Sequence, residues 1–255
     1  MNLQNKKVLI TGALGSLGRA ETEKMLSAGA QVYMLDLDEE QGRLYVNKLK
    51  CDFGESVNVK FIALNLSELE LSYKTVKQLC DEIDGIDILV NNAAIMPHGP
   101  IETITLETFE NAQRVNTHAV FALIKAVVPH MKAKREGRII NFCSITMNGC
   151  WGDYSPYIAS KGAILALTRT LARELGKWNI LVNAIAPGAI PSEAEQRVFG
   201  SEWHEYNDWV LTSQSLKHRG EPEDIGDMVV FLSSQYSKFI TGQNLHVNGG
   251  WLMEG

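Results

Sequence analysis

Six short apolar runs rich in Val, Ile and Leu recur along the chain, with helical patterns in the longer segments between them. Each run is continuously apolar rather than alternating, which is typical of strands covered on both faces. The alternation of strands and helices predicts a parallel sheet with helices on both faces, a doubly wound α/β fold. The predicted strands are Lys7–Thr11, Gln31–Asp36, Val59–Leu64, Ile86–Asn91, Arg138–Cys143 and Ile180–Ile185.

The segment 189–217 interrupts this alternation. It follows a Pro-Gly pair and is rich in Glu, Ser and aromatic residues, among them Phe199, Trp203, Tyr206 and Trp209. The segment predicts a small helical lid or substrate loop, and an amphipathic helix pair packed on the body fits the pattern equally well. The chain has no internal repeat, low-complexity tract or Pro/Ser linker, so residues 1–255 are expected to form one domain.

A glycine-rich segment joins the first predicted strand to a predicted helix over Leu17–Ala28. It reads Thr11-Gly12-Ala13-Leu14-Gly15-Ser16-Leu17-Gly18. Glycine allows a positive φ and a close approach of the backbone to a ligand, and the N–H groups at a helix start favour pyrophosphate. Because this is the first βα unit, the segment predicts a dinucleotide site in a Rossmann-type sheet. A plain strand–helix turn is the alternative.

Asp36, at the end of the second predicted strand, indicates which dinucleotide is bound. A carboxylate there accepts hydrogen bonds from the ribose hydroxyls of NAD and repels the extra phosphate of NADP. Leu37 follows, so no basic residue stands next to it. Arg19, just inside the first helix, could accommodate the extra phosphate, so NADP remains an alternative cofactor. The alternative role for Asp36 is that of a turn or helix-cap residue.

A second signal is formed by Ser144, Tyr157 and Lys161. Tyr157 and Lys161 lie four residues apart in a helical segment, so both side chains share one face. A nearby ammonium favours the phenolate and lowers the pKa of a tyrosine, as proton transfer to or from a carbonyl oxygen requires. Tyr73 and Lys77 have the same spacing in an ordinary charged helix, but only Tyr157 follows a strand end that carries a residue such as Ser144.

Composition narrows the class of protein further. The net charge is −6, and no Lys/Arg cluster is present, which argues against nucleic acid as a partner. The four cysteines (Cys51, Cys80, Cys143 and Cys150) form no C-x-x-C pair or zinc spacing, so we expect free thiols and no metal. The first residues lead straight into a strand and no long apolar run occurs, so we expect a cytoplasmic protein without a membrane segment.

The motifs taken together resemble the single-domain branch of the short-chain dehydrogenase/reductase family, over nearly the whole chain. The resemblance implies a Rossmann-type fold, a nicotinamide cofactor and hydride transfer. The motifs that carry it are Thr11–Gly18, Asn91-Asn92-Ala93-Ala94, Val115-Asn116-Thr117, Ser144, Tyr157-Ile158-Ala159-Ser160-Lys161, Asn183-Ala184-Ile185-Ala186-Pro187-Gly188, Ile240-Thr241-Gly242-Gln243 and Val247-Asn248-Gly249-Gly250.

The resemblance implies roles for the matched residues. Tyr157 would be the acid/base and Ser144 would hydrogen-bond the substrate oxygen. Lys161 would hold the nicotinamide ribose and lower the pKa of Tyr157, and Asn116 would help to hold a water that relays protons to Lys161. The implied cofactor-binding residues, besides Tyr157 and Lys161, are Thr11, Gly12, Gly15, Ser16, Leu17, Gly18, Asp36, Asn65, Leu66, Asn92, Ala93, Ala94, Pro187, Gly188 and Ile190.

Several positions depart from the family pattern. Ser16 stands at the usual middle glycine, and Gly15 is one place early, a spacing typical of the nucleotide-sugar branch of the superfamily. Asn65 stands where an Asp commonly touches the adenine. These are exchanges of cofactor contacts, and none removes a catalytic group.

The substrate side is less readable. His98, Ser144, Ile145, Trp151 and Trp203 flank the predicted site and are expected to contact substrate, with ordinary packing as the alternative for most of them. A wide apolar wall would favour a cyclic or aromatic alcohol over a sugar. The long predicted helices Leu106–Lys134 and Pro156–Lys177 are expected to pair across two-fold axes into a homotetramer, as in related enzymes, unless burial within one chain explains their apolar faces.

The expected function is that of an NAD(H)-dependent oxidoreductase, which interconverts a small-molecule secondary alcohol with a ketone or aldehyde. An NADP(H)-dependent carbonyl reductase of the same family is the nearest alternative. A non-catalytic dinucleotide sensor would not need Asn116, Ser144, Tyr157 and Lys161. A nucleotide-sugar epimerase would need a substantial carboxy-terminal domain, for which little chain follows the sixth predicted strand.

Overall fold

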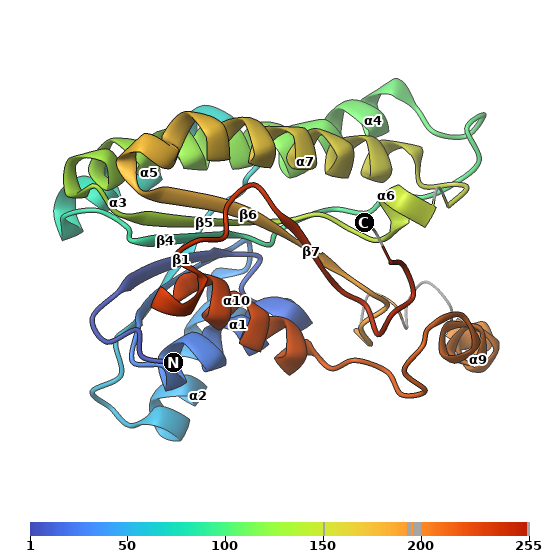
Figure 1. Ribbon diagram of the computed structural model, residues 1–255, viewed down its shortest axis with the longest axis horizontal. Helices are drawn as coiled ribbons and strands as arrows, with labels where there is room; N and C mark the ends of the chain where they lie inside the picture. Colours follow the sequence, from blue (N-terminus) through green and yellow to red (C-terminus); the bar gives the residue numbers. More distant parts are fainter. Residues whose placement is uncertain (150, 193–194, 196–199, 254–255) are drawn as a thin grey trace.

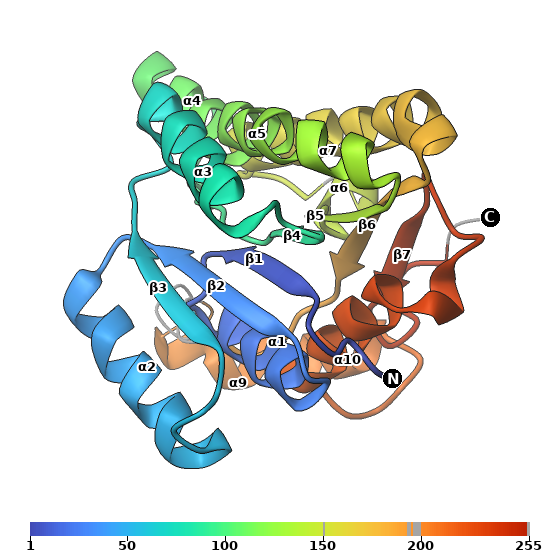
Figure 2. The ribbon, with the colours of Figure 1, turned by 90° about the vertical axis from the view of Figure 1, so that its left-hand side faces the viewer.

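A computed structural model describes residues 1–149, 151–192, 195 and 200–253. Within these residues, seven parallel strands form one sheet in the order β3-β2-β1-β4-β5-β6-β7 (Figures 1 and 2). The predicted doubly wound α/β fold is therefore confirmed. The strands are β1 (Lys7–Thr11), β2 (Gln31–Asp36), β3 (Val59–Ala63), β4 (Ile88–Asn91), β5 (Gly137–Phe142), β6 (Ile180–Pro187) and β7 (Asn244–Val247).

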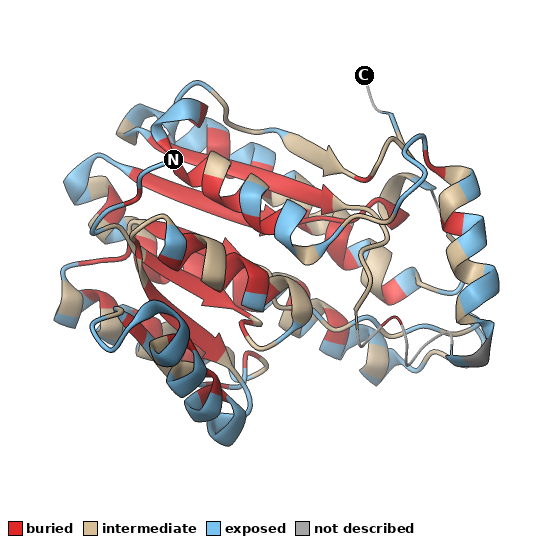
Figure 3. Cartoon of the chain, turned by 90° about the horizontal axis from the view of Figure 1, so that it is seen from below, coloured by how far each residue is buried: buried red, intermediate tan, exposed pale blue. Residues whose placement is uncertain are grey.

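Helices cover both faces of the sheet. On one face lie α3, α4, α5 and α7, and on the other lie α1, α2 and α10 (Figure 1). The strands between them are buried along most of their length (Figure 3), which explains why their sequences are continuously apolar. The helices are α1 (Ser16–Ser27), α2 (Glu39–Phe53), α3 (Leu69–Ile83), α4 (Leu106–Gln113), α5 (Ala119–Lys134), α6 (Thr146–Gly149), α7 (Ser155–Leu175), α9 (Trp203–Ser213) and α10 (Pro222–Ser233).

The switch point of the sheet lies between β1 and β4, where the chain order reverses. In the register, Thr11 of β1 is aligned with Leu35 of β2, and Asn91 of β4 with Asn141 of β5. The carboxyl ends of these strands therefore lie side by side. Parallel α/β sheets bind ligands at this position, so the fold places the residues that follow β1, β2, β4 and β5 around one potential site.

The predicted elements differ from the structure in three places. The strand β7 was not predicted, because it is only four residues long and includes the polar Asn244 and His246. The predicted helix Leu106–Lys134 is present but contains a π-helical turn at Arg114–His118. The predicted lid contains α9, which stands apart from both helix layers (Figure 1), whereas residues 193–194 and 196–199, Phe199 among them, lie outside the described residues.

Among the described cysteines, Cys51, Cys80 and Cys143 are free thiols, and Cys150 lies outside the part of the chain that the structure describes. In that part, no helix combines the length and apolar character needed to cross a bilayer. The same residues contain no group of three or more His, Cys, Asp or Glu side chains placed to hold a metal ion.

Glu21 of α1 is a buried carboxyl group in the middle of that helix. It is 0% exposed, and neither carboxylate oxygen has a hydrogen-bond partner among the residues that the structure describes. Burial raises the pKa of Glu21 to about 8, because an apolar environment disfavours the charged form. The folded protein therefore holds a proton that the unfolded chain, with a carboxyl pKa of 4.5, releases.

We expect the free energy of unfolding to fall as the pH rises from 4.5 to about 8, the window between the unfolded and folded pKa values of Glu21. The loss amounts to about 1.4 kcal/mol for each unit by which the two values differ. Glu21→Gln should remove this dependence and stabilise the protein at pH 8, as measured by urea unfolding across the pH range. The exposed Glu70→Gln is the control, and an unchanged pH dependence in the Glu21 variant would contradict the assignment.

Candidate active site

The residues after β1, β2, β3 and β4 line a cleft of about 800 Å³. Asn92 bridges two of these strand ends, since its Nδ2 donates to the carbonyl oxygens of Thr11 at 3.0 Å and Gly12 at 3.2 Å. The ends of β1 and β4, which are neighbours at the centre of the sheet, are thereby held together. The predicted cofactor residues that line the cleft are Gly12, Gly15, Ser16, Leu17, Asp36, Asn65, Leu66, Asn92, Ala93 and Ala94.

The glycine-rich turn forms one wall of the cleft. Gly12 has a φ of +66°, and a Cβ there would lie 2.9 Å from Cα of Ala93, so only glycine fits. Gly15 is the N-cap of α1; no side chain caps the helix there, and its first turn holds no acidic residue. The N–H groups of α1 are thus open to an anion, and the turn fits a dinucleotide pyrophosphate.

Two predicted cofactor residues stand behind this turn. The Thr11 hydroxyl accepts a hydrogen bond from the backbone N–H of Ala93 at 3.1 Å. Gly18 packs directly on the carbonyl group of Gly12, where any Cβ would overlap with it. Neither residue lines the cleft, so both shape the turn from behind.

Asp36 is placed at the far end of the cleft from the strands β5 and β6. Its Oδ2 accepts from the N–H of Leu14 at 2.9 Å and its Oδ1 from the N–H of Leu37 at 2.7 Å. Each carboxylate oxygen can accept a further bond, so Asp36 ties the β2 end to the glycine-rich turn and still offers acceptors to a ribose. The turn role proposed as the alternative and the ribose role are therefore compatible.

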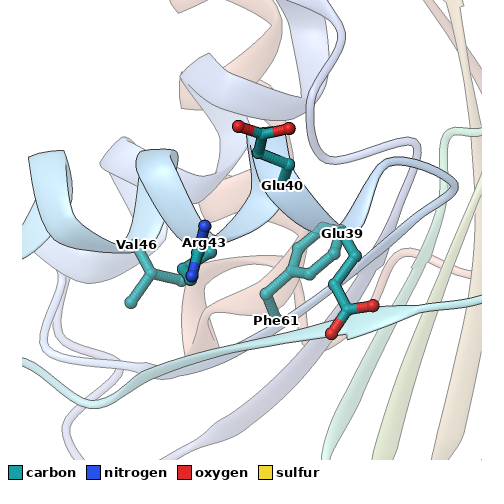
Figure 4. Close-up of a pocket in the computed structure, with 5 residues that line it drawn as sticks. All are labelled: Glu39, Glu40, Arg43, Val46 and Phe61. Carbon is teal, nitrogen blue, oxygen red and sulfur yellow. The ribbon is translucent and has the colours of Figure 1, made fainter.

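Two arginines, Arg19 and Arg43, could offer a positive charge near Asp36, but neither lines this cleft. Arg19 donates from Nε to the carbonyl of Leu14 at 2.8 Å, and its guanidinium lies 5.1 Å from the ring centre of Tyr45. Arg43 lines a separate cavity of about 670 Å³ between α2 and the edge strand β3, together with Glu39, Glu40, Val46 and Phe61 (Figure 4). That cavity shares no lining residue with the cleft. Its two acidic residues, Glu39 and Glu40, lie in the first turn of α2, where negative charge stabilises the helix.

A second cavity, of about 240 Å³, continues the cleft toward β5 and β6. The two share Leu17, Asn92, Ala94 and Ser192 as lining residues. The structure therefore brings the dinucleotide turn and the predicted catalytic residues to one continuous space. The predicted residues that line this second cavity are Ser144, Ile145, Trp151, Tyr157, Lys161, Pro187, Gly188 and Ile190.

Tyr157, Lys161 and Ser144 meet in this second cavity. Both Tyr157 and Lys161 come from the start of α7, and the Lys161 Nζ lies 5.4 Å from the ring centre of Tyr157. Lys161 is only 3% exposed and donates to the carbonyl of Phe142 at 2.7 Å. The Ser144 hydroxyl accepts from the N–H and hydroxyl of Thr146 at 3.2 and 2.9 Å, which leaves its own proton for Tyr157.

The protonation states differ from the prediction that the ammonium lowers the pKa of the tyrosine. Burial raises the pKa of Tyr157 to about 12, although the hydrogen bond from Ser144 lowers it in part. Burial lowers the pKa of Lys161 to about 8. At neutral pH the site therefore holds a neutral phenol beside an ammonium group, because desolvation by burial is the largest influence on the pKa of both residues.

Asn116 does not line either cavity. It lies in the π-helical turn, where its Oδ1 accepts from the N–H of Ile95 and its Nδ2 donates to the carbonyl of Ile95, both at 2.8 Å. Nδ2 also donates to Ser160 Oγ at 3.0 Å. The Asn116 side chain thus joins the segment after β4 to α7, next to Lys161, and π-helical turns of this kind are frequent at functional sites.

The Tyr73–Lys77 pair has the surroundings of a surface pair. Lys77 forms an ion pair with Asp81 at 2.7 Å, with both side chains exposed. Tyr73 lies under Lys125, whose Nζ is 5.4 Å from the ring centre. The same sequence spacing therefore occurs both at the site and away from it, and the strand-end position distinguishes the two.

The predicted substrate residues divide into two groups. Ser144, Ile145 and Trp151 line the second cavity, whereas His98 touches it only through Tyr154, with ring centres 5.6 Å apart. Trp203 lies beside His204 and lines neither cavity. Lining residues that the sequence did not assign to the site include Met96, Thr146 and Glu195, because no local pattern marks them.

Comparisons with known proteins agree with this geometry. The family model described as "Enoyl-(Acyl carrier protein) reductase" matches residues 12–252. The 5-keto-D-gluconate 5-reductase of Escherichia coli (strain K12) is 32% identical over 252 residues, 99% of this chain and 97% of that protein. The 3-oxoacyl-[acyl-carrier-protein] reductase FabG of Vibrio cholerae is 33% identical over 253 residues, 99% of this chain and 100% of that protein.

A solved structure is similar over the same length. The gluconate 5-dehydrogenase from Burkholderia cenocepacia J2315, in complex with NADP and tartrate, superposes with a TM-score of 0.91 at 27% identity, covering 98% of this chain and 96% of that one. The chain belongs to the short-chain dehydrogenase/reductase family. It is an oxidoreductase.

Proposed function

We propose that the protein is an NAD(H)-dependent oxidoreductase that interconverts a secondary alcohol with a ketone or aldehyde, with Tyr157 as the general acid/base. The observation that carries the proposal is the placement of Ser144, Tyr157 and Lys161 in one cavity that continues into the dinucleotide cleft. A non-catalytic sensor would need the cleft alone. A screen of ketones and secondary alcohols, followed by NADH absorbance, tests the proposal; no turnover of any member would contradict it.

The bound nicotinamide would supply or accept the hydride. In the direction of reduction, Tyr157 donates its phenolic proton to the carbonyl oxygen of the substrate, and Ser144 donates a hydrogen bond to that oxygen as its charge develops. The Lys161 ammonium stabilises the phenolate that remains. In oxidation the phenolate of Tyr157 takes the hydroxyl proton instead.

The choice of NAD over NADP rests on Asp36. Its charge at the ribose end of the cleft would oppose a 2′-phosphate, while Arg19 is turned to Leu14 and Tyr45, and Arg43 lines a different cavity. The NADP complex of the similar Burkholderia structure favours the alternative, an NADP(H)-dependent carbonyl reductase.

We expect the wild-type protein to prefer NADH, and Asp36→Asn to lower the ratio of kcat/KM for NADH over NADPH by roughly 10- to 100-fold, the range for losing hydrogen bonds to a charged group. Asp38→Asn, two residues away on the exposed start of α2, removes the same charge and keeps a capping side chain. It should leave the ratio unchanged. A wild-type preference for NADPH would refute the assignment of Asp36.

We also propose a homotetramer. Leu106 of α4 and Phe121 of α5 are 83% and 53% exposed, on the helices for which pairing is expected, and exposed large apolar side chains favour an interface. Sedimentation of the purified protein should give four times the chain mass of 28.3 kDa. Phe121→Asp should lower that mass, and a monomeric wild-type protein would contradict the proposal.

A further inference from the structure

A buried ion pair lies at the substrate end of the second cavity. Glu195 lines the cavity, and its Oε1 accepts from Arg219 Nη2 at 2.5 Å. Arg219 also donates to the carbonyl of Ala189 at 3.0 Å and to Asn207 Oδ1 at 3.2 Å. Its guanidinium lies 5.7 Å from the ring centre of Tyr206, which lines the cavity too. Three segments of the lid region thus converge on Arg219.

The second carboxylate oxygen of Glu195, Oε2, does not take part in the ion pair with Arg219. The residue is 8% exposed, and its Oε2 has no hydrogen-bond partner among the residues that the structure describes. A carboxylate is a pure acceptor, so Oε2 can accept from a donor that enters the cavity, beside the Tyr206 hydroxyl that already interacts with the same carboxylate. Buried polar atoms are normally paired, and an orphaned one at the wall of a binding cavity points to a ligand group.

The charges around the cavity favour a neutral ligand. Its only charged lining residues in the described part of the chain are Lys161 and Glu195. The Lys161 ammonium is engaged by the Phe142 carbonyl beside Tyr157, and Arg219 is neutralised by Glu195 and does not line the cavity. Beyond Tyr157, a substrate therefore meets a negative charge and no unpaired positive one.

The remaining wall at this end is aromatic. Trp151, Tyr154 and Tyr206 line it, and the Trp151 ring also packs on Trp209 of α9 at 5.6 Å between centres. Such rings offer apolar surface for a carbon chain, while Glu195 offers an acceptor for its hydroxyl groups. The wide apolar wall that would favour a cyclic or aromatic alcohol is thus only part of the lining, because a carboxylate lies among the rings.

We infer that Glu195 determines substrate specificity by selecting a neutral hydroxylated carbonyl compound, or the corresponding polyol, and by rejecting keto acids. The inference rests on the proposed function. It separates this protein from the relatives named for gluconate, whose substrate is an anion. A hydroxyl of the substrate donates to Glu195 Oε2, whereas a carboxylate has no proton to donate and would meet Oε2 directly, with Arg219 held behind Glu195 and outside the cavity lining.

A matched substrate pair tests the charge selection directly. L-Sorbose differs from 5-keto-D-gluconate only in carrying CH₂OH in place of the carboxylate. We expect kcat/KM for reduction by NADH to be roughly 10- to 100-fold higher for L-sorbose, as like-charge contact at a buried site implies. Equal or faster reduction of the keto acid would overturn the inference while leaving the proposed function intact.

The variant Glu195→Gln tests whether Glu195 is the residue that causes the charge selectivity. The variant keeps the size of the side chain and leaves the Arg219 charge unpaired, so selectivity should move at least tenfold toward 5-keto-D-gluconate. Glu205→Gln on the exposed side of α9 makes the same exchange and should leave selectivity unchanged. A selectivity that stays the same in Glu195→Gln, with the melting temperature preserved, would overturn the inference.

Binding provides a readout that needs no turnover. D-Glucitol and D-gluconate cannot be oxidised by a protein loaded with NADH, so calorimetric titration measures their affinity alone. D-Glucitol should bind more tightly to the wild type, and Glu195→Gln should narrow or reverse the difference. Tighter binding of D-gluconate, or binding of neither compound, would overturn the inference even if no carbonyl compound were reduced.

Discussion

Tyr157→Phe should lower kcat for carbonyl reduction by roughly 10²- to 10⁴-fold, the range that a positioned general acid contributes. The variant removes one hydroxyl, and with it the proton that Tyr157 would give to a substrate oxygen beside Ser144 in the second cavity. The dinucleotide cleft loses no lining group, so NADH affinity, measured by fluorescence titration, should change little. The melting temperature should also stay close to that of the wild type.

Tyr73→Phe is the matched control for this prediction. Tyr73 has a lysine four residues later, as Tyr157 does, but it lies on α3 beneath Lys125. Its replacement should leave kcat unchanged. Turnover of the Tyr157 variant at a comparable rate would remove the assigned acid/base, whereas loss of NADH binding in that variant would show a structural role instead.

Most of the sheet could be predicted from the sequence because its strands are buried on both faces. A continuously apolar run such as Val8–Ile10 has few alternatives inside an α/β chain, and β1 and β2 match their predicted bounds. The short strand β7 could not be predicted in this way, because Asn244–Val247 is half-buried and mixes polar with apolar residues. Pairing with β6 creates this strand, so its existence depends on contacts that no local pattern contains.

The candidate site was predictable where one helix or one turn positions it. Spacing alone placed Tyr157 and Lys161 on the same face of α7, and both line one cavity. The direction of the Tyr157 pKa was not predictable in the same way, because it depends on how deeply the phenol is buried. The sequence spacing identifies Lys161 as the neighbour of Tyr157, whereas the desolvation that raises the pKa of Tyr157 depends on the fold.

The substrate end of the second cavity shows more clearly what the sequence alone cannot predict. Glu195 and Arg219 are 24 residues apart, with α9 between them, and neither stands in a pattern that singles it out. The packing of Trp151 against Trp209 and Trp251, with ring centres 5.6 and 5.3 Å away, likewise joins three distant segments. Long-range convergence of this kind defines specificity, and only the folded chain displays it.

Lys161 should set the pH dependence of reduction. Burial lowers its pKa to about 8, so the ammonium is present below that pH and is lost as the pH rises through it. The charged form stabilises the phenolate that Tyr157 leaves after giving up its proton. We therefore expect kcat/KM for carbonyl reduction to be level below pH 8 and to fall about tenfold per pH unit above it.

Lys161→Met should lower kcat/KM by roughly 10²- to 10⁴-fold and remove the break near pH 8 from the activity that remains. Lys77→Met, in the exposed pair on α3, should keep both the rate and the break. The pH profile separates a charge effect from a loss of packing, because a merely structural defect would lower the rate at every pH and leave the break in place. A Lys161 variant with the wild-type profile would mean that another group titrates there, and the phenolate would then lack its proposed counter-charge.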